Sequence, residues 1–131
     1  MYQVMVVDDE PMAASLIVNI IKQKYNKFEI MGTAYNGEEA LELIQEKGEP
    51  DILITDIQMP VMNGYEATRS IRAGESSYWK KLPIIAMTAN VFQEDERKAA
   101  ECGMNGYVTK PVDMEIIYSV LEKWLPGIYN S

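Results

Sequence analysis

The sequence has 131 residues, of which 47% are hydrophobic and 24% are charged, a balance typical of one compact globular domain. Its 20 acidic residues outnumber its 12 basic ones, and the resulting net charge of −8 disfavours direct binding to nucleic acid. The lone Cys102 excludes an intramolecular disulfide, the lack of histidine excludes His-based catalysis, and no apolar run approaches the length of a membrane span. We therefore expect a cytoplasmic domain with no membrane partner.

Short apolar runs rich in β-branched residues alternate five times with longer helical patterns along the whole chain. This alternation predicts an α/β fold, in which helices cover both faces of a parallel sheet. The central runs are almost continuously apolar, as expected for strands that are buried on both faces. One domain over residues 1–131 accounts for the pattern. The predicted strands cover residues 3–7, 29–34, 52–55, 84–87 and 107–109.

Capping residues mark the helices between these strands. Asp9 and Pro11 open the first helix, and Asn36 with Glu39 resembles a capping box before the second. The segment that contains Tyr78-Trp79 is expected to be a loop packed against the third or fourth helix. The last three helices are predicted over residues 64–74, 90–103 and 113–125, where glycine or proline ends each pattern.

Polar residues stand at the carboxyl ends of four of the five predicted strands. Asp8 and Asp9 follow the first, Asp56 the third, Thr88 the fourth and Lys110 the fifth. Taken singly, each has an ordinary structural role as a helix cap, a loop residue, a backbone hydrogen-bond partner or a surface lysine. Because the carboxyl ends of parallel strands meet at one edge, we expect all five to converge on one crevice.

The residue types in this crevice indicate phosphoryl chemistry. Three carboxylates close together repel one another, and a divalent cation relieves that repulsion. Oxygen-only ligands favour Mg²⁺, with Mn²⁺ as an alternative, and without His or clustered Cys an ordinary Zn²⁺ site is excluded. A lysine and a hydroxyl beside such an ion would stabilise the charged oxygens of a phosphoryl group.

Four segments together resemble the receiver domains of bacterial two-component response regulators, the chemotaxis-Y-like superfamily. They are Val-Val-Asp8-Asp9-Glu-Pro, Ile-Thr-Asp56-Ile-Gln-Met-Pro-Val-Met-Asn-Gly64, Ala-Met-Thr88-Ala-Asn and Gly-Tyr107-Val-Thr-Lys110-Pro111. Each is weak alone, but all four in this order are specific, and the likeness covers almost the whole chain. It implies a flavodoxin-like (βα)5 architecture with strand order 2-1-3-4-5.

The resemblance also implies a role for each residue of the crevice. Asp56 would accept a phosphoryl group from a sensor histidine kinase or a histidine phosphotransfer protein. Asp9 would ligate Mg²⁺ directly, Asp8 would help to hold it through water, and the backbone carbonyl of Gln58 would be a further ligand. The domain would then be a signalling module, whose only catalysis is its own Mg²⁺-dependent phosphorylation and dephosphorylation.

The remaining implied roles concern the response to phosphorylation. Thr88 would sense the phosphoryl group, Lys110 would pair with it, and Tyr107 would be an aromatic switch. The switch would alter the face built from the fourth helix, fifth strand and fifth helix, where an output domain or a second copy would bind. The bond between Lys110 and Pro111 is expected to be cis, since an X-Pro cis bond costs little.

The first helix is expected to form part of the kinase-docking surface. The stretch from Met12 to Ile21 contains no charged residue, so its apolar side chains exceed what one helix face can bury against a sheet. Ala14 is expected to lie on this docking surface.

Two other classes of protein share parts of this pattern. A haloacid-dehalogenase-like, Mg²⁺-dependent phosphohydrolase also uses an aspartate nucleophile, but it has a second aspartate two residues on, where this chain has Gln58. A flavodoxin-like nucleotide or flavin binder needs a Gly- or Ser/Thr-rich phosphate loop, whereas Asp8-Asp9-Glu10 would repel a phosphate. The start at Met1 favours a solitary or N-terminal receiver, and a fragment of a larger regulator or hybrid kinase stays open.

Overall fold

The computed structural model describes residues 2–24, 28–57, 59, 62–74, 77–88, 93–110 and 112–125. Five parallel strands form one sheet in the order β2-β1-β3-β4-β5, which confirms the predicted topology. Each strand overlaps one predicted run. The strands are β1 (Tyr2–Val7), β2 (Phe28–Ala34), β3 (Ile52–Asp56), β4 (Ile84–Thr88) and β5 (Gly106–Thr109).

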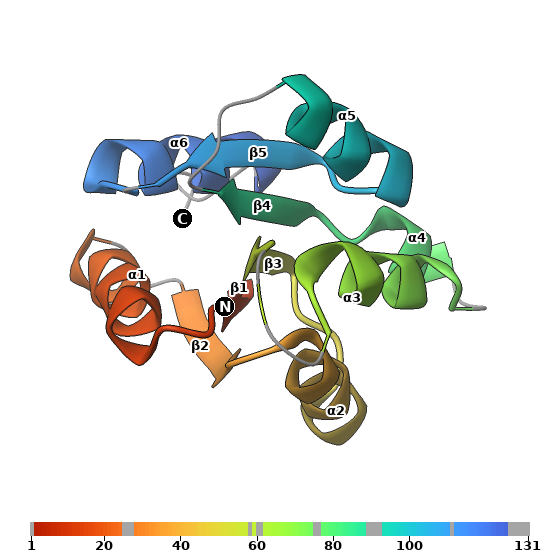
Figure 1. Ribbon diagram of the computed structural model, residues 1–131. Helices are drawn as coiled ribbons and strands as arrows, with labels where there is room; N and C mark the ends of the chain where they lie inside the picture. The colour runs from red at the N-terminus through yellow and green to blue at the C-terminus, as the bar shows by residue number, and fades with distance from the viewer. Residues whose placement is uncertain are drawn as a thin grey trace.

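Helices cover both faces of the sheet, with α1 and α6 on one side and α2, α3 and α5 on the other (Figure 1). The predicted fourth and fifth helices are α5 and α6, because a short additional helix precedes β4. None of the helices in the described part of the chain is both long and apolar enough to cross a membrane. The helices are α1 (Pro11–Lys24), α2 (Gly37–Lys47), α3 (Gly64–Arg72), α4 (Ser77–Lys81), α5 (Gln93–Cys102) and α6 (Met114–Trp124).

The alternation of side chains along the strands explains why the central runs are apolar throughout. In β1, Val4 and Val6 pack in the core under α1 and α6, whereas Met5 and Val7 pack in the core under α2, α3 and α5. All four are fully or almost fully buried. With both faces covered, a polar residue is tolerated only where a strand ends.

The additional helix α4 corrects the prediction of a loop around Tyr78-Trp79. Arg72 at the end of α3 donates from Nη1 to the Trp79 carbonyl oxygen over 2.9 Å, and from Nε and Nη2 to the Gly103 carbonyl oxygen over 3.0 and 2.7 Å. A methyl group added at Gly74 would lie within 2.8 Å of the Trp79 indole. The segment therefore packs closely against α3, as predicted, but it makes one helical turn there.

The strand register aligns the carboxyl ends of the sheet. Val7 pairs with Thr55, Asp56 pairs with Met87, and Thr88 pairs with Thr109. The polar residues at or just after these positions therefore lie in one row at the same edge. The strand order reverses between β1 and β3, and such a reversal is where open parallel sheets form ligand sites.

Candidate functional site

Three carboxylates meet at the carboxyl edge of the sheet. Asp8 and Asp9 follow β1, and Asp56 is the last residue of β3. One carboxylate oxygen from each lies within 4.8 Å of the others. Asp8 and Asp56 are buried, while Asp9 is exposed. A hard divalent cation fits this cluster, because three convergent carboxylates and an open side leave room for water ligands.

Lys110 is the positive charge that the fold supplies to this cluster. Its Nζ donates a hydrogen bond to Asp8 Oδ2 over 3.0 Å and lies 3.4 Å from Asp56 Oδ2. The backbone N–H of Lys110 donates to the Thr88 carbonyl oxygen over 2.7 Å. The lysine is thus fixed at its backbone by β4 and at its side chain by residues that follow β1 and end β3.

Burial controls the electrostatics of the cluster. Removal from water raises the pKa of Asp56 to about 6; Lys110 opposes this rise, and the charges of Asp8 and Asp9 add to it. Burial opposes the charge of Lys110, but its hydrogen bond to Asp8 and the charge of Asp56 outweigh that effect and raise the lysine's pKa. One lysine therefore does not fully balance the buried carboxylates.

Local backbone geometry holds the two ends of the cluster. The Asp8 backbone N–H donates to the Ala34 carbonyl oxygen over 3.0 Å, and Asp8 Oδ1 accepts from the Glu10 N–H over 3.0 Å. Thr88 is buried at the end of β4. The sequence-predicted residues Asp8, Asp9, Asp56 and Lys110 are therefore brought together, and Thr88 ends the strand that lies between those of Asp56 and Lys110.

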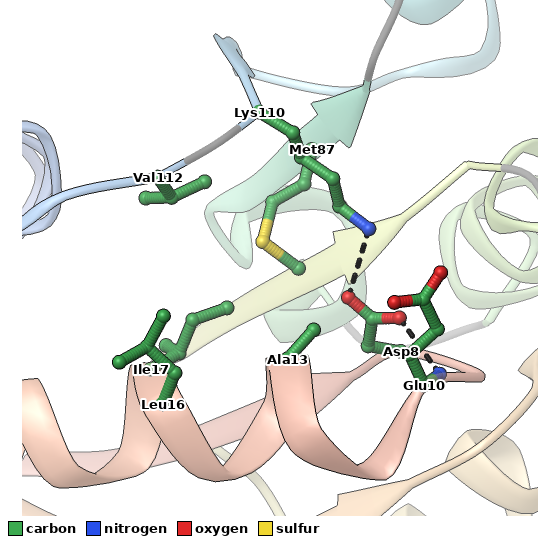
Figure 2. A pocket seen from close by; sticks show the side chains of 8 residues that line it. All are labelled: Asp8, Glu10, Ala13, Leu16, Ile17, Met87, Lys110 and Val112. Carbon is green, nitrogen blue, oxygen red and sulfur yellow. Dashed lines mark hydrogen bonds and ion pairs between the residues drawn. The ribbon is translucent and has the colours of Figure 1, made fainter.

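A pocket of about 400 Å³ opens beside the cluster, between α1 and the residues after β5. Figure 2 shows Lys110 and Asp8 pointing toward each other at one end of this pocket. The rest of its wall is apolar apart from Glu10. The lining residues are Asp8, Glu10, Ala13, Leu16, Ile17, Met87, Lys110 and Val112.

Two predicted features lie outside the described residues. They are the backbone carbonyl of Gln58 and the Lys110–Pro111 bond, and both stay predictions. Tyr107 lies within β5, is half-buried and packs against the core under α2, α3 and α5. The sequence did not predict the hydrogen bond from the Thr55 hydroxyl to the Asp56 carbonyl oxygen, because a β-branched residue in a buried strand gives no sign of a polar contact.

Comparison with known proteins identifies the class. The family model described as "Response regulator receiver domain" matches residues 4–122, and the chain belongs to this family. It is 36% identical over 123 residues to Hybrid signal transduction histidine kinase I of Dictyostelium discoideum, covering 91% of this chain but 7% of that protein. It is also 32% identical over 140 residues to Histidine kinase 2 of Arabidopsis thaliana, covering 93% of this chain and 12% of that protein.

Solved structures agree with the family. The chemotaxis response regulator CheY4 of Vibrio cholerae superposes with a TM-score of 0.82 at 29% identity, covering 95% of this chain and 99% of that one. The receiver domain of a sensor histidine kinase from Pseudomonas aeruginosa, with magnesium coordinated in its active-site cleft, gives 0.80 at 30% identity, covering 94% and 96%. The domain is thus homologous to receivers of histidine kinases and response regulators, and the haloacid-dehalogenase alternative gains no support.

The raised pKa of Asp56 predicts that the site lowers stability in metal-free protein. A carboxyl whose pKa rises from 3.8 to about 6 on folding binds more protons when folded, so stability falls as pH increases between these values. This rise in pKa corresponds to at most about 3 kcal/mol of folding stability, which is lost fully once the pH exceeds the pKa of the folded state. Asp56→Asn should therefore be more stable than wild type at pH 7.5 by roughly 1 to 3 kcal/mol, and equal to it near pH 4.

Urea denaturation in chelator across this pH range measures the difference. Mg²⁺ should reduce the difference in stability between Asp56→Asn and wild type, because it binds the folded wild type and stabilises it by mass action. A variant that is no more stable than wild type at pH 7.5 would contradict the prediction.

Proposed function

We propose that this chain is a phosphorelay receiver that accepts a phosphoryl group on Asp56. The observation that carries the proposal is the burial of this carboxylate with its Oδ2 3.4 Å from Lys110 Nζ, inside a cluster of two further carboxylates. Asp56 ends β3, whereas Asp8 and Asp9 follow β1 and Lys110 follows β5. Since β3 lies between β1 and β5 in the sheet, Asp56 is the carboxylate placed between the acidic pair and the lysine. Asp8 is already engaged by Lys110.

The proposed reaction exchanges one phosphorus bond for another. A carboxylate oxygen of Asp56 attacks phosphorus, and the phosphorus–nitrogen bond of a phosphohistidine breaks as the acyl phosphate forms. The donor imidazole leaves with the bonding electron pair and takes up a proton. Lys110 Nζ and the Thr88 hydroxyl are the donors that stand at the ends of neighbouring strands to bind the phosphoryl oxygens.

A divalent cation, Mg²⁺ or alternatively Mn²⁺, would supply the positive charge that one lysine does not. Asp9 and Asp56 would ligate it, and Asp8 would help through water because one of its oxygens already accepts from Lys110. When bound, the cation neutralises charge on the phosphoryl oxygens during transfer. Its presence in a similar receiver from Pseudomonas aeruginosa supports this assignment.

The remaining parts of the proposal concern organisation and partners. The phosphodonor is a sensor histidine kinase or a histidine phosphotransfer protein, and residues 1–131 form one receiver domain. A cytoplasmic location follows from a donor that draws its phosphoryl group from ATP. The domain is a signalling module that catalyses only its own phosphorylation and dephosphorylation, and it does not touch nucleic acid.

The phosphorylation site has a direct test. Incubation with acetyl phosphate and Mg²⁺ should give one acid-labile phosphoryl group per wild-type chain, and Asp56→Asn should abolish it. Chelation of Mg²⁺ should do the same to wild type, and Asp9→Ala should lower the labelling rate by about a hundredfold. The exposed Glu115, outside the cluster, provides the control variant Glu115→Gln, which should label like wild type. Persistent labelling of Asp56→Asn would overturn the assignment.

The proposed docking surface for the phosphodonor lies on α1. Met12 is 86% exposed and Leu16 is 55% exposed, and Leu16 lines the pocket beside Asp8 and Lys110. A partner helix that carries a phosphohistidine could insert an apolar side chain there. Ala14 is buried in the core, so the prediction that it lies on the docking surface is wrong.

Leu16→Glu should therefore slow transfer from the histidine-containing donor by at least about tenfold, because it places a charge in an apolar contact. Phosphorylation by acetyl phosphate, which needs no docking, should not change. Gln23→Glu is the matched control, since it adds the same charge to the exposed end of the same helix. Equal slowing with both donors would reject the docking role.

The proposed output surface is built from α5, β5 and α6. Lys110 and Thr88 would be drawn toward the new dianion, and Tyr107, three residues before Lys110 on β5, would turn inward as Thr88 moves. A groove beside Tyr107, lined by Val108, Val120 and Trp124 among others, gives this surface an apolar recess for an output domain or a second copy.

NMR of the Tyr107 ring with and without a phosphoryl mimic tests the switch. Its resonances should shift on activation in wild type and shift much less in Thr88→Ala, which lacks the hydroxyl. Phe28 is the first residue of β2, the edge strand on the opposite side of the sheet from β5, so its ring resonances serve as the internal control. Unchanged Tyr107 resonances in activated wild type would eliminate the mechanism.

A further inference from the structure

The peptide group between Asp56 and Ile57 lies where the pairing of β3 with β1 has ended but the pairing of β3 with β4 continues. Pairing between β1 and β3 ends at Val7 and Thr55, so the ladder on that side stops before the Asp56 carbonyl. On the other side, the Ile57 N–H of the same peptide group donates to the Met87 carbonyl oxygen over 3.2 Å. One end of this peptide is therefore held by β4, and the other end needs a different partner.

Thr55 supplies that partner. Its hydroxyl donates to the Asp56 carbonyl oxygen over 2.9 Å, and both residues are buried. Successive strand residues point to opposite faces, so the Thr55 side chain lies on the face of α3 while the Asp56 carboxylate lies on the other. The hydroxyl therefore acts on the acceptor's backbone without entering the crevice.

Gly64, the first residue of α3, lies against the same carbonyl. A methyl group added there would lie 2.5 Å from the Asp56 carbonyl oxygen, closer than real contacts allow. Gly64 itself is anchored, since its N–H donates to the Ile57 carbonyl oxygen over 3.0 Å and its carbonyl accepts from the buried Thr68 hydroxyl over 2.8 Å. The start of α3 is thus clamped onto the peptide that carries the acceptor.

We propose that Thr55 is a positioning residue for phosphoryl transfer, whose hydroxyl, with Gly64, fixes the Asp56 peptide and so aims its carboxylate at Lys110 and the acidic pair. Without the hydroxyl, the buried Asp56 carbonyl loses this hydrogen bond, and the peptide is freer to rotate. Small misplacements of a nucleophile lower the rate of transfer strongly, since proximity and orientation supply much of the rate. This inference rests on the proposed function of Asp56.

Two pairs of variants isolate the hydroxyl. Thr55→Val replaces the hydroxyl with a methyl group of similar size. Thr55→Ser and Thr55→Ala differ from each other only by the hydroxyl. In each pair, loss of the hydroxyl should lower the rate of labelling by acetyl phosphate in saturating Mg²⁺ by about fivefold to tenfold, the factor for one hydrogen bond. Thr55→Ser should keep a rate close to that of wild type. If Thr55→Val does not fold, the second pair carries the test.

A second readout needs neither metal nor phosphodonor. In metal-free protein, the Ile57 amide should exchange with solvent about fivefold faster in the hydroxyl-lacking member of each pair. Ile117→Val is the control, because it removes a methylene from the core under α6, on the other face of the sheet. It should lower global stability while leaving the labelling rate of folded protein and the relative protection of Ile57 unchanged.

The outcomes distinguish failure of the Thr55 role from failure of the proposed function. Equal labelling rates within both pairs, or an equal rate loss in Ile117→Val, would overturn the role of Thr55 while leaving Asp56 as acceptor. If wild type takes no label, or if Asp56→Asn still takes it, the proposed function fails instead. Slower labelling in both hydroxyl-lacking variants, with faster Ile57 exchange and an unaffected control, would establish the positioning role.

Discussion

The burial of two carboxylates against a single lysine is the constraint on which this structure depends. Asp8 and Asp56 are both removed from water, and Asp9 adds a third negative charge at the open side. Within the described part of the chain, Lys110 is the one cation paired with Asp8 and Asp56, and it does not fully balance the three charges. Such a cluster raises the pKa of Asp56 and weakens the fold above that pKa. The apolar core buried on both faces of the parallel sheet offsets this cost. What makes the site poor for stability also makes it ready for a cation and a phosphoryl group.

The topology is the means by which the chain assembles this cluster. Asp8 and Lys110 lie 102 residues apart in sequence, and their contact exists because both follow parallel strands in register at the same edge. The reversal of strand order at β1 and β3 leaves the acidic residues side by side without a helix between them. Helices cover both faces of the sheet and so hold the four polar strand ends in place. Strands covered on both faces must be apolar along their length.

The sequence predicted the parts of this structure that repeat or that carry charge. Strand positions followed from apolar runs, and the crevice followed from polar residues at their ends, because both signals are local. The rotation of α1 did not follow, since a helix apolar on nearly all sides has no marked polar face, and Ala14 turned out to be buried while Leu16 is exposed. The single turn of α4 accepts a hydrogen bond from the side chain of Arg72, seven residues before Trp79, and the apolar pattern gives no sign of this contact. The hydrogen bond from the Thr55 hydroxyl to the Asp56 carbonyl oxygen also could not be predicted, because it depends on where the pairing between β1 and β3 ends.

The contacts of Lys110 join the pocket under α1 to the end of β4. On one side its side chain borders the pocket under α1, with Val112 just beyond it in the same wall. On the other side its backbone N–H is bonded to the carbonyl oxygen of Thr88, and Tyr107 precedes it in β5. A displacement of the lysine toward a phosphoryl group would therefore pull on the end of β4 and on β5 together. Because the core on both faces is closely packed, such a pull would be expressed as a change between discrete packings and not as a local relaxation.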